Sequence, residues 1–125
     1  MALVHDGATA GVREMAARAL CSLAMNDDNQ VAIAAAGGIP PLVALVRDCG
    51  TAGEREMAAA ALWNLAMNDD NKVAIAAAGG IPPLVALVRD GGTAGEREYA
   101  AAALVHLAEN ADNKVAIAAA GGIVQ

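Results

Sequence analysis

The chain repeats one segment, Asn71-Lys-Val-Ala-Ile-Ala-Ala-Ala-Gly-Gly-Ile-Pro-Pro-Leu-Val-Ala-Leu-Val88, at a fixed spacing. The same segment occurs 42 residues earlier, from Asn29 to Val46, with Gln30 in place of Lys72 as the only change. It begins a third time at Asn113. A fixed period of this length predicts a chain built from stacked supersecondary units rather than around one closed core.

The amino-acid composition favours the same architecture. The 125 residues include no Phe, one Trp and one Tyr, and 57% of them are hydrophobic, with alanine prominent. Each small side chain removes little apolar surface from water, so one closed core would be thin and stacked units suit the chain better. The formal net charge of −6 argues against a nucleic-acid partner, because phosphate binding needs a basic surface.

The longest apolar run, Val31 to Val46, is interrupted by Gly37-Gly38 and Pro40-Pro41. Crossing a membrane takes about 20 consecutive apolar residues. We therefore expect two short buried helices joined by a turn, and no membrane partner. The chain's first residues lack the basic start and long apolar segment of a signal peptide, so none is expected.

The two cysteines occupy non-equivalent positions of the repeat. One unit later, Cys21 is replaced by Trp63 and Cys49 by Gly91. A disulfide framework would recur with the units, so we predict free thiols and a reducing compartment, the cytoplasm.

Each unit is expected to contain three helices. In the unit from Asn29 to Asp70, residues 30–36 form a short helix with Asn29 or Asp28 as N-cap, and Gly37-Gly38 ends it. Proline in the first turn predicts a second helix over about 40–48. Thr51-Ala-Gly-Glu54 is a capping box that opens a longer third helix, which runs to about Met67.

These units organise the chain as a single domain, 1–125. Residues 29–70 and 71–112 are whole units that differ at seven of 42 positions. Residues 1–28 match only the end of the second helix and the third helix, and residues 113–125 match only the first helix.

Comparison of the third helices separates two faces. Invariant residues, including Ala58, Ala61, Leu62, Leu65 and Ala66, form one face, which we expect to be fixed by packing. The differing positions share a broad opposite face because their spacing is 3, 3, 3, 1 and 3. Met25, Met57 and Met67 are interpreted as adaptable packing residues. The differing sets are Val12/Glu54/Glu96, Met15/Met57/Tyr99, Arg18/Ala60/Ala102, Cys21/Trp63/Val105, Ser22/Asn64/His106 and Met25/Met67/Glu109.

Three helices per unit, the Gly-Gly break, proline at the second helix and the hexapeptide Ala61-Leu-Trp-Asn-Leu-Ala66 resemble the armadillo repeat. The similarity covers essentially the whole chain and is greatest to the β-catenin and vacuolar armadillo types. It implies an all-α, right-handed α-solenoid. The near-identity of two units is typical of recent duplication or of an engineered, consensus-like array, and both interpretations stay open.

The resemblance also implies a site. Armadillo third helices line a concave groove that binds extended peptides, and the groove asparagine of the family matches Asn64, with Ser22 and His106 at the equivalent positions. Where the family often has tryptophan one turn earlier, this chain has Arg18, Ala60 and Ala102. Pockets between tryptophans are therefore missing, and Trp63 is either a single aromatic anchor or a residue packed between third helices. The predicted peptide contacts are Asn64, Trp63, Ser22, His106, Arg18, Glu56 and Tyr99.

Two functions follow as hypotheses. The first is a non-enzymatic scaffold that binds an extended peptide segment of another protein. A weak preference for a basic partner is expected from the acidic residues Glu14, Glu56, Glu98 and Glu109. The second is a structural or engineered module that self-associates through complementary, uncapped ends, as a homo-oligomer without a natural ligand.

An enzyme or a metal protein is not expected. The chain has two isolated histidines and two cysteines without metal-ligand spacing, and His106 has no second group placed to orient it. The tracts 26–29 and 68–71 lack the glycine and glutamate of an EF-hand loop, so we interpret them as helix caps. No cofactor, metal or catalytic residue is predicted.

Overall fold

Eight α-helices make up the secondary structure of residues 9–48 and 51–121, the part of the chain that the computed structural model describes, and this part contains no strand. Cys49 and the outer ends of the two predicted partial units lie outside the described residues. The helices are α1 (Ala10–Leu23), α2 (Asp27–Ala35), α3 (Ile39–Asp48), α4 (Ala52–Leu65), α5 (Asp69–Ala77), α6 (Ile81–Asp90), α7 (Ala94–Leu107) and α8 (Ala111–Ala119).

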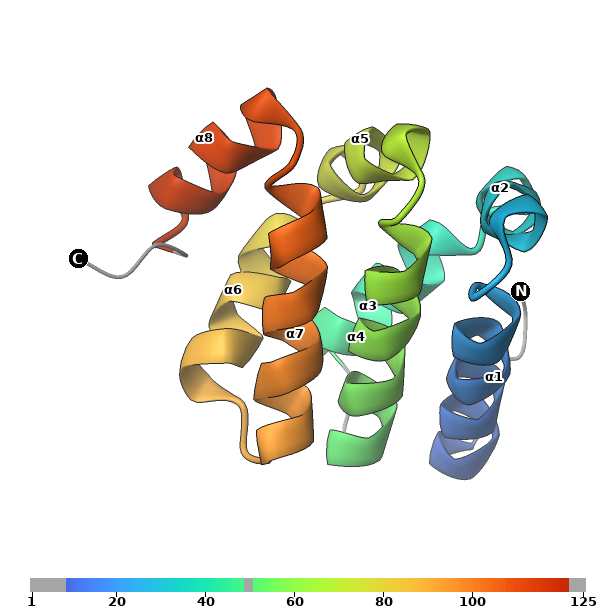
Figure 1. The fold of residues 1–125 in the computed structure, drawn as a ribbon. Helices are drawn as coiled ribbons and strands as arrows, with labels where there is room; N and C mark the ends of the chain where they lie inside the picture. Colours follow the sequence, from blue (N-terminus) through green and yellow to red (C-terminus); the bar gives the residue numbers. More distant parts are fainter. Residues whose placement is uncertain (1–8, 49–50, 122–125) are drawn as a thin grey trace.

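The helices repeat as a short, a medium and a long element and stack into an α-solenoid, as predicted. The long helices α1, α4 and α7 lie side by side in one layer, with α3 and α6 behind them (Figure 1). The short helices α2, α5 and α8 follow one another across one end of this layer (Figure 1). Each repeat therefore contacts the next through equivalent elements, which is how a solenoid buries its apolar surface.

The short helices begin three residues earlier than predicted. Asn26 is the N-cap of α2, and its side-chain oxygen accepts a hydrogen bond from the Asn29 N–H at 3.1 Å. The predicted N-caps, Asn29 and Asp28, are therefore wrong. This start places Asp27 and Asp28 in the first turn, where the helix dipole favours negative charge. Asn68 and Asn110 cap α5 and α8 in the same way.

The Gly-Gly break ends each short helix as predicted. Gly37 and Gly79 both have φ of +80°, a left-handed conformation that glycine adopts without a Cβ clash. The Gly37 N–H donates to the Ala34 carbonyl and the Gly38 N–H donates to the Ile33 carbonyl, which completes a Schellman turn.

This turn bends α2 against Ile39–Arg47 of α3 by 83°. The equivalent pair in the next repeat, Asp69–Ala77 and Ile81–Asp90, is bent by 85°. No single helix among the described residues is long and apolar enough to cross a membrane, and only these two bent pairs reach that length and composition together.

Threonine caps open the long helices. Thr51 and Thr93 accept hydrogen bonds from the Glu54 and Glu96 N–H groups, each at 3.1 Å. At Thr93 the capping box is complete, because the Glu96 carboxylate also accepts from the Thr93 N–H at 3.1 Å. The helix predicted to reach about Met67 ends at Leu65, with Ala66 as its C-cap.

Alanine and leucine make up the packed face of the long helices. The predicted packing residues Ala58, Ala61, Leu62, Leu65 and Ala66 are all fully buried. Because alanine is small, neighbouring long helices approach closely. Leucines of the long and medium helices and one isoleucine from each short helix fill the space between them.

A buried ion pair joins each long helix to the next. The Arg13 Nε on α1 lies 2.6 Å from the Glu54 carboxylate on α4, and the Arg55 Nε on α4 lies 2.7 Å from the Glu96 carboxylate on α7. Both glutamate side chains are 0% exposed. Assigning Glu54 and Glu96 to the face free to vary was therefore wrong, because these side chains are part of the packing between repeats.

The surroundings of Glu54 keep it charged. Burial alone would raise its pKa, but hydrogen bonds from Arg13 and Thr51 together hold the pKa of this carboxyl below its ordinary value. The same balance lowers the pKa of Glu96, with Arg55 and Thr93 as its partners. Each junction between long helices therefore contains a charged carboxylate with no exposure to water.

Replacing Glu96 by alanine is expected to lower the free energy of unfolding by about 3 kcal/mol, because it leaves the Arg55 guanidinium partly buried without its carboxylate. Chemical denaturation measures this change. Glu98→Ala, which removes an exposed carboxylate from the same helix, should change stability by less than about 0.5 kcal/mol. Equal effects of the two substitutions would contradict a structural role for Glu96.

Stability should also fall in acid. Because the folded-state pKa of both Glu54 and Glu96 is lowered, their contribution is fully present above the ordinary value of 4.5 and is lost as the pH falls through the folded-state value. Denaturation midpoints measured at a series of pH values should decline below that point. The Glu54→Gln, Glu96→Gln double variant should show a shallower decline, and an unchanged slope would refute this assignment.

Candidate functional site

The predicted contacts lie on the surface of α1, α4 and α7 that carries Ser22, Asn64 and His106, which we call the third-helix face. These three residues occupy equivalent positions on neighbouring helices. Ser22 is exposed, whereas Asn64 and His106 are half-buried. The repeat therefore sets them in a row, with a different polar group at each step.

Asn64 already has a partner in the neighbouring repeat. Its Nδ2 donates to the Cys21 carbonyl at 2.8 Å and lies 3.4 Å from the Cys21 Sγ. Carbonyls in the last turn of a helix have no partner within the helix, so Asn64 caps the end of α1. Both contacts use the amide nitrogen, and neither uses the amide oxygen.

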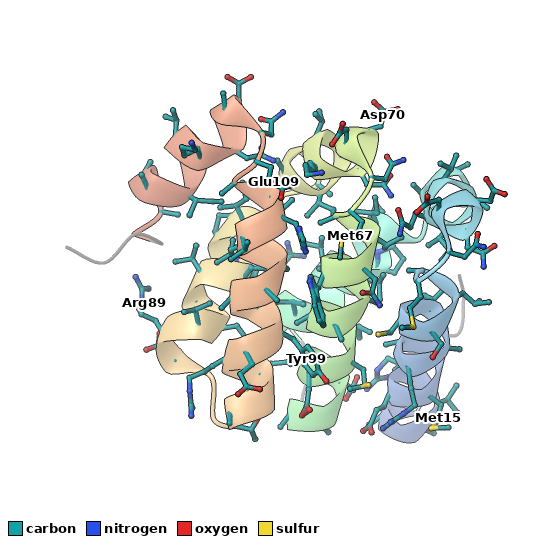
Figure 2. All side chains as sticks on the ribbon, in the orientation of Figure 1. Met15, Met67, Asp70, Arg89, Tyr99 and Glu109 are labelled. Atoms are coloured by element: carbon teal, nitrogen blue, oxygen red, sulfur yellow. The ribbon has the colours of Figure 1, made fainter. Side chains whose placement is uncertain are left out.

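Trp63 and Tyr99, the only aromatic residues of the chain, pack against each other across α4 and α7. Their ring centroids are 5.8 Å apart with an interplanar angle of 35°. Figure 2 shows Tyr99 on the side of α7 that faces α4. Both rings are half-buried, so Trp63 lies between long helices and still presents part of its surface.

Cys21 and Met57 occupy the equivalent positions one repeat earlier. Cys21 is a free thiol, and burial raises its pKa against the opposing effects of Arg18 and Asn64. Arg18 is mostly exposed and lies 3.3 Å from the Glu14 carboxylate, one turn earlier on α1.

Two of the predicted acidic groove residues lie against the next repeat. A methyl group at Gly53 would overlap the Glu14 carboxylate, and one at Gly95 would overlap the Glu56 carboxylate. Both glycines are in the first turn of a long helix, where the helix dipole favours a negative charge. Glu14 and Glu56 therefore stabilise the start of the following long helix, and this position limits their contact with a ligand.

A charged cluster that was not predicted from the sequence lies at one end of the third-helix face. It consists of Lys72, Asp69, Glu109 and His106. The Lys72 Nζ lies 2.8 Å from Asp69 and 3.3 Å from Glu109, and its side chain is only 5% exposed. Burial alone would lower the pKa of Lys72, but these two carboxylates raise it. The His106 Nδ1 lies 3.6 Å from the other oxygen of Glu109.

A signal for this cluster was present in the sequence. Gln30 and Met67 of one unit are replaced by Lys72 and Glu109 of the next, so two of the seven differences form a single ion pair. Tyr99, which replaces Met57 of the preceding unit, is another of the seven differences, and it packs against Trp63.

Apolar side chains are exposed near the same end. Met25 is 76% exposed, Met67 is 46% exposed and Val105 is 64% exposed. Figure 2 shows Met67 and Glu109 at corresponding ends of α4 and α7. The packing prediction holds for Met57, which lies against the core, and is wrong for Met25 and Met67, because α1 and α4 end before them.

The described ranges, 9–48 and 51–121, contain no group of three or more His, Cys, Asp and Glu side chains placed to hold a metal ion. In the tracts 26–29 and 68–71, Asn26 and Asn68 are helix N-caps. Asn71 is buried, and its Nδ2 donates to the carbonyls of Gln30 and Leu65. The chemistry that this surface offers is hydrogen bonding and apolar contact.

Residues 26–67 and 68–109 each match the repeat described as Armadillo/beta-catenin-like, and together they span more than half of the chain. The chain belongs to the armadillo repeat family. Both matches begin at an asparagine N-cap, three residues before the predicted unit boundaries at 29 and 71.

Solved structures with the same fold include engineered armadillo proteins. An engineered protein from the Northeast Structural Genomics Consortium superposes with a TM-score of 0.89 at 32% identity, over 96% of this chain and 49% of that one. A computationally designed armadillo repeat protein for modular peptide recognition gives 0.86 at 28%, over 96% and 50%. A designed armadillo repeat protein in complex with the peptide (KR)4 gives the same four values.

The chain spans about half the length of these structures. None of the curated proteins compared with it matches.

Proposed function

We propose that this armadillo chain is a non-enzymatic protein-interaction scaffold that holds an extended peptide on the third-helix face. The observation that carries the proposal is the row of Ser22, Asn64 and His106 beside the half-exposed Trp63–Tyr99 pair. Designed armadillo proteins that recognise peptides have the same fold, which supports the assignment.

Asn64 is the proposed contact to the peptide backbone. Its amide nitrogen is held by Cys21, which fixes the orientation of the carboxamide, and its amide oxygen is an acceptor for a peptide N–H. Holding a polar group in place before binding reduces the entropy that binding costs. Ser22 and His106 supply hydrogen-bonding groups one repeat to either side.

The partner's side chains should be mainly apolar at the centre of the segment. Trp63, Tyr99 and Met67 provide an aromatic and thioether surface that suits aliphatic or aromatic side chains. Of the four acidic residues, Glu14 and Glu56 lie on helix starts and Glu109 is paired with Lys72, which leaves Glu98 as the one exposed carboxylate without such a contact. We therefore expect the predicted preference for basic partners to be small.

We also assign the protein to the cytoplasm, on the basis of its thiols. Cys21 is free in the structure, and Cys49 lies outside the described residues. Free thiols are typical of a reducing compartment.

Binding to an array of overlapping extended peptides is expected to depend on the third-helix face. Trp63→Ala should weaken the detected interactions about tenfold or more, because it removes a large contact surface. Asn64→Ala should weaken them less, through the loss of one backbone contact. Peptides with apolar centres should bind more tightly than a Lys-Arg repeat of the same length.

Arg89→Ala serves as the surface control, since Arg89 is exposed on α6, away from the third-helix face (Figure 2). Circular dichroism must show that each variant keeps its helices, because Asn64→Ala also removes a cap of α1. If folded Trp63→Ala and Asn64→Ala proteins retain every interaction of the wild type, the binding surface is elsewhere.

A second candidate function is self-association of the chain. The outer surface of α1 favours it, since Val12 is 41% exposed, Met15 is 61% exposed and Leu23 is 51% exposed. Figure 2 shows Met15 on the side of α1 away from α4. The equivalent surface of α4 is covered by α1, whereas no helix within residues 9–48 and 51–121 covers the outer face of α1.

Light scattering should therefore report a mean mass above that of the 12.4-kDa chain at tens of micromolar, rising with concentration. Open heterologous faces give concentration-dependent oligomers rather than one fixed size. A strictly monomeric mass throughout a dilution series would exclude self-association of the wild type in this range.

A further inference from the structure

The molecule contains the same helix-to-helix junction twice. At the first junction α1 packs against α4, and at the second α4 packs against α7. At each junction we call the later helix, which carries the glycine in its first turn, the receiving helix, and the earlier one the inserting helix. Both use a buried Arg–Glu pair and a glutamate that lies over a glycine in the first turn of the receiving helix. At the second junction, Trp63 of α4 also packs against Tyr99 of α7.

The receiving surface of this junction recurs on α1, where the described residues leave it open. Nothing lies within 4 Å of a Cβ built on Gly11, whereas the equivalent Gly53 and Gly95 adjoin a glutamate carboxylate. Ala19 is exposed, whereas its equivalents are fully buried. A hollow of about 620 Å³ follows this surface, lined by Thr9, Gly11, Val12, Met15, Ala16 and Ala19.

The inserting surface recurs on α7. Arg97 and Glu98 are exposed there, at the positions of Arg55 and Glu56, which are engaged at the inner junction. Arg97 instead donates through Nη1 to the Gly91 carbonyl, within its own repeat, at 2.7 Å. Val105 is 64% exposed at the position of Trp63.

We propose that the occupant of the α1 surface is α7 of a second copy of this chain, docked in the register of the internal junctions. In that register Glu98 of one copy lies over Gly11 of the next, and Val105 lies beside Met15. The proposal rests on the second candidate function and deepens it, by naming the two surfaces and their alignment.

The short helices fit the same register. The Asn71 Nδ2 donates to the Gln30 carbonyl at 3.1 Å, and the Asn113 Nδ2 donates to the Lys72 carbonyl at 3.0 Å. In both cases the acceptor is one residue after the equivalent asparagine of the preceding repeat. Both asparagines are buried, whereas Asn29 is half-exposed. In the docked pair, Asn29 of the second copy is aligned with the Lys114 carbonyl of the first.

One position breaks the match. Where α4 and α7 have Glu54 and Glu96, α1 has Val12. Docking therefore sets the Arg97 guanidinium against an apolar side chain at the position where the internal junctions supply a glutamate carboxylate, so this compensation for its desolvation is lost. Val12 weakens the contact between copies while leaving its shape intact.

The experiment restores the missing group. Val12→Glu should tighten self-association about tenfold or more, the effect expected of one charge-assisted hydrogen bond with Arg97. Sedimentation velocity over a concentration series of the full chain measures it. Val12→Gln is the matched control, since glutamine also serves the cap at Thr9 but carries no charge, and it should associate like the wild type.

Arg97→Ala in the Val12→Glu background should return association to the wild-type level, which identifies the partner of the new carboxylate. Equal association of Val12→Glu and Val12→Gln would overturn the proposal, and so would tight association that persists without Arg97. A wild type that stays monomeric at every concentration would overturn the proposal together with the second candidate function, whereas an associating wild type with equal Val12→Glu and Val12→Gln variants would overturn the register alone. Peptide binding by the third-helix face is independent of every outcome.

Discussion

The buried arginine–glutamate pair between consecutive long helices is the constraint on which the stacking of this chain depends. An interface of alanines is smooth, and one turn of displacement would replace one small side chain by another at little cost. A carboxylate with no exposure to water allows no such displacement, because it would then lack the guanidinium that compensates its burial. Buried ion pairs often add little net stability, and here their effect is to select one register among several that alanine would permit.

The short helices stabilise the C-terminal ends of the long helices. Each long helix ends with carbonyls that have no intrahelical partner, and side chains of α2 and α5 reach the carbonyls at the ends of α1 and α4. Gln30 donates to the Ala24 carbonyl at 2.9 Å, Asn71 donates to the Leu65 carbonyl at 3.0 Å, and Lys72 reaches the Met67 carbonyl at 3.4 Å. No buried side-chain nitrogen or oxygen in the described part of the chain lacks a partner. A helix of nine residues therefore closes one repeat and, through asparagine, attaches to the preceding one.

Much of this architecture follows from the sequence, since periodicity, glycine pairs and threonine caps are local signals. Local rules did not resolve the start of the short helix, because Asn26, Asp27, Asp28 and Asn29 are all acceptable caps and only packing selects among them. Glu54 was misassigned because the capping box already explained it, whereas its partner lies 41 residues away. The contacts of Asn64 and Trp63 were likewise beyond local reasoning, since each partner belongs to a different repeat. For the ion pairs between long helices, the sequence did contain a clue, because arginine and glutamate recur at equivalent positions of consecutive repeats.

The Lys72–Glu109 pair means that the repeats are not interchangeable modules. Recombination between the near-identical units 29–70 and 71–112 would lengthen or shorten the array by one unit. A shortened chain would join Gln30 to a repeat that ends in Glu109, which leaves an exposed carboxylate and a neutral amide. A lengthened chain would join Lys72 to a repeat that ends in Met67, and a buried ammonium would lose one of its two carboxylates. For a crossover between the equivalent positions 30/72 and 67/109, contraction therefore leaves no buried charge without a partner, whereas growth removes one of the two carboxylates beside a buried ammonium.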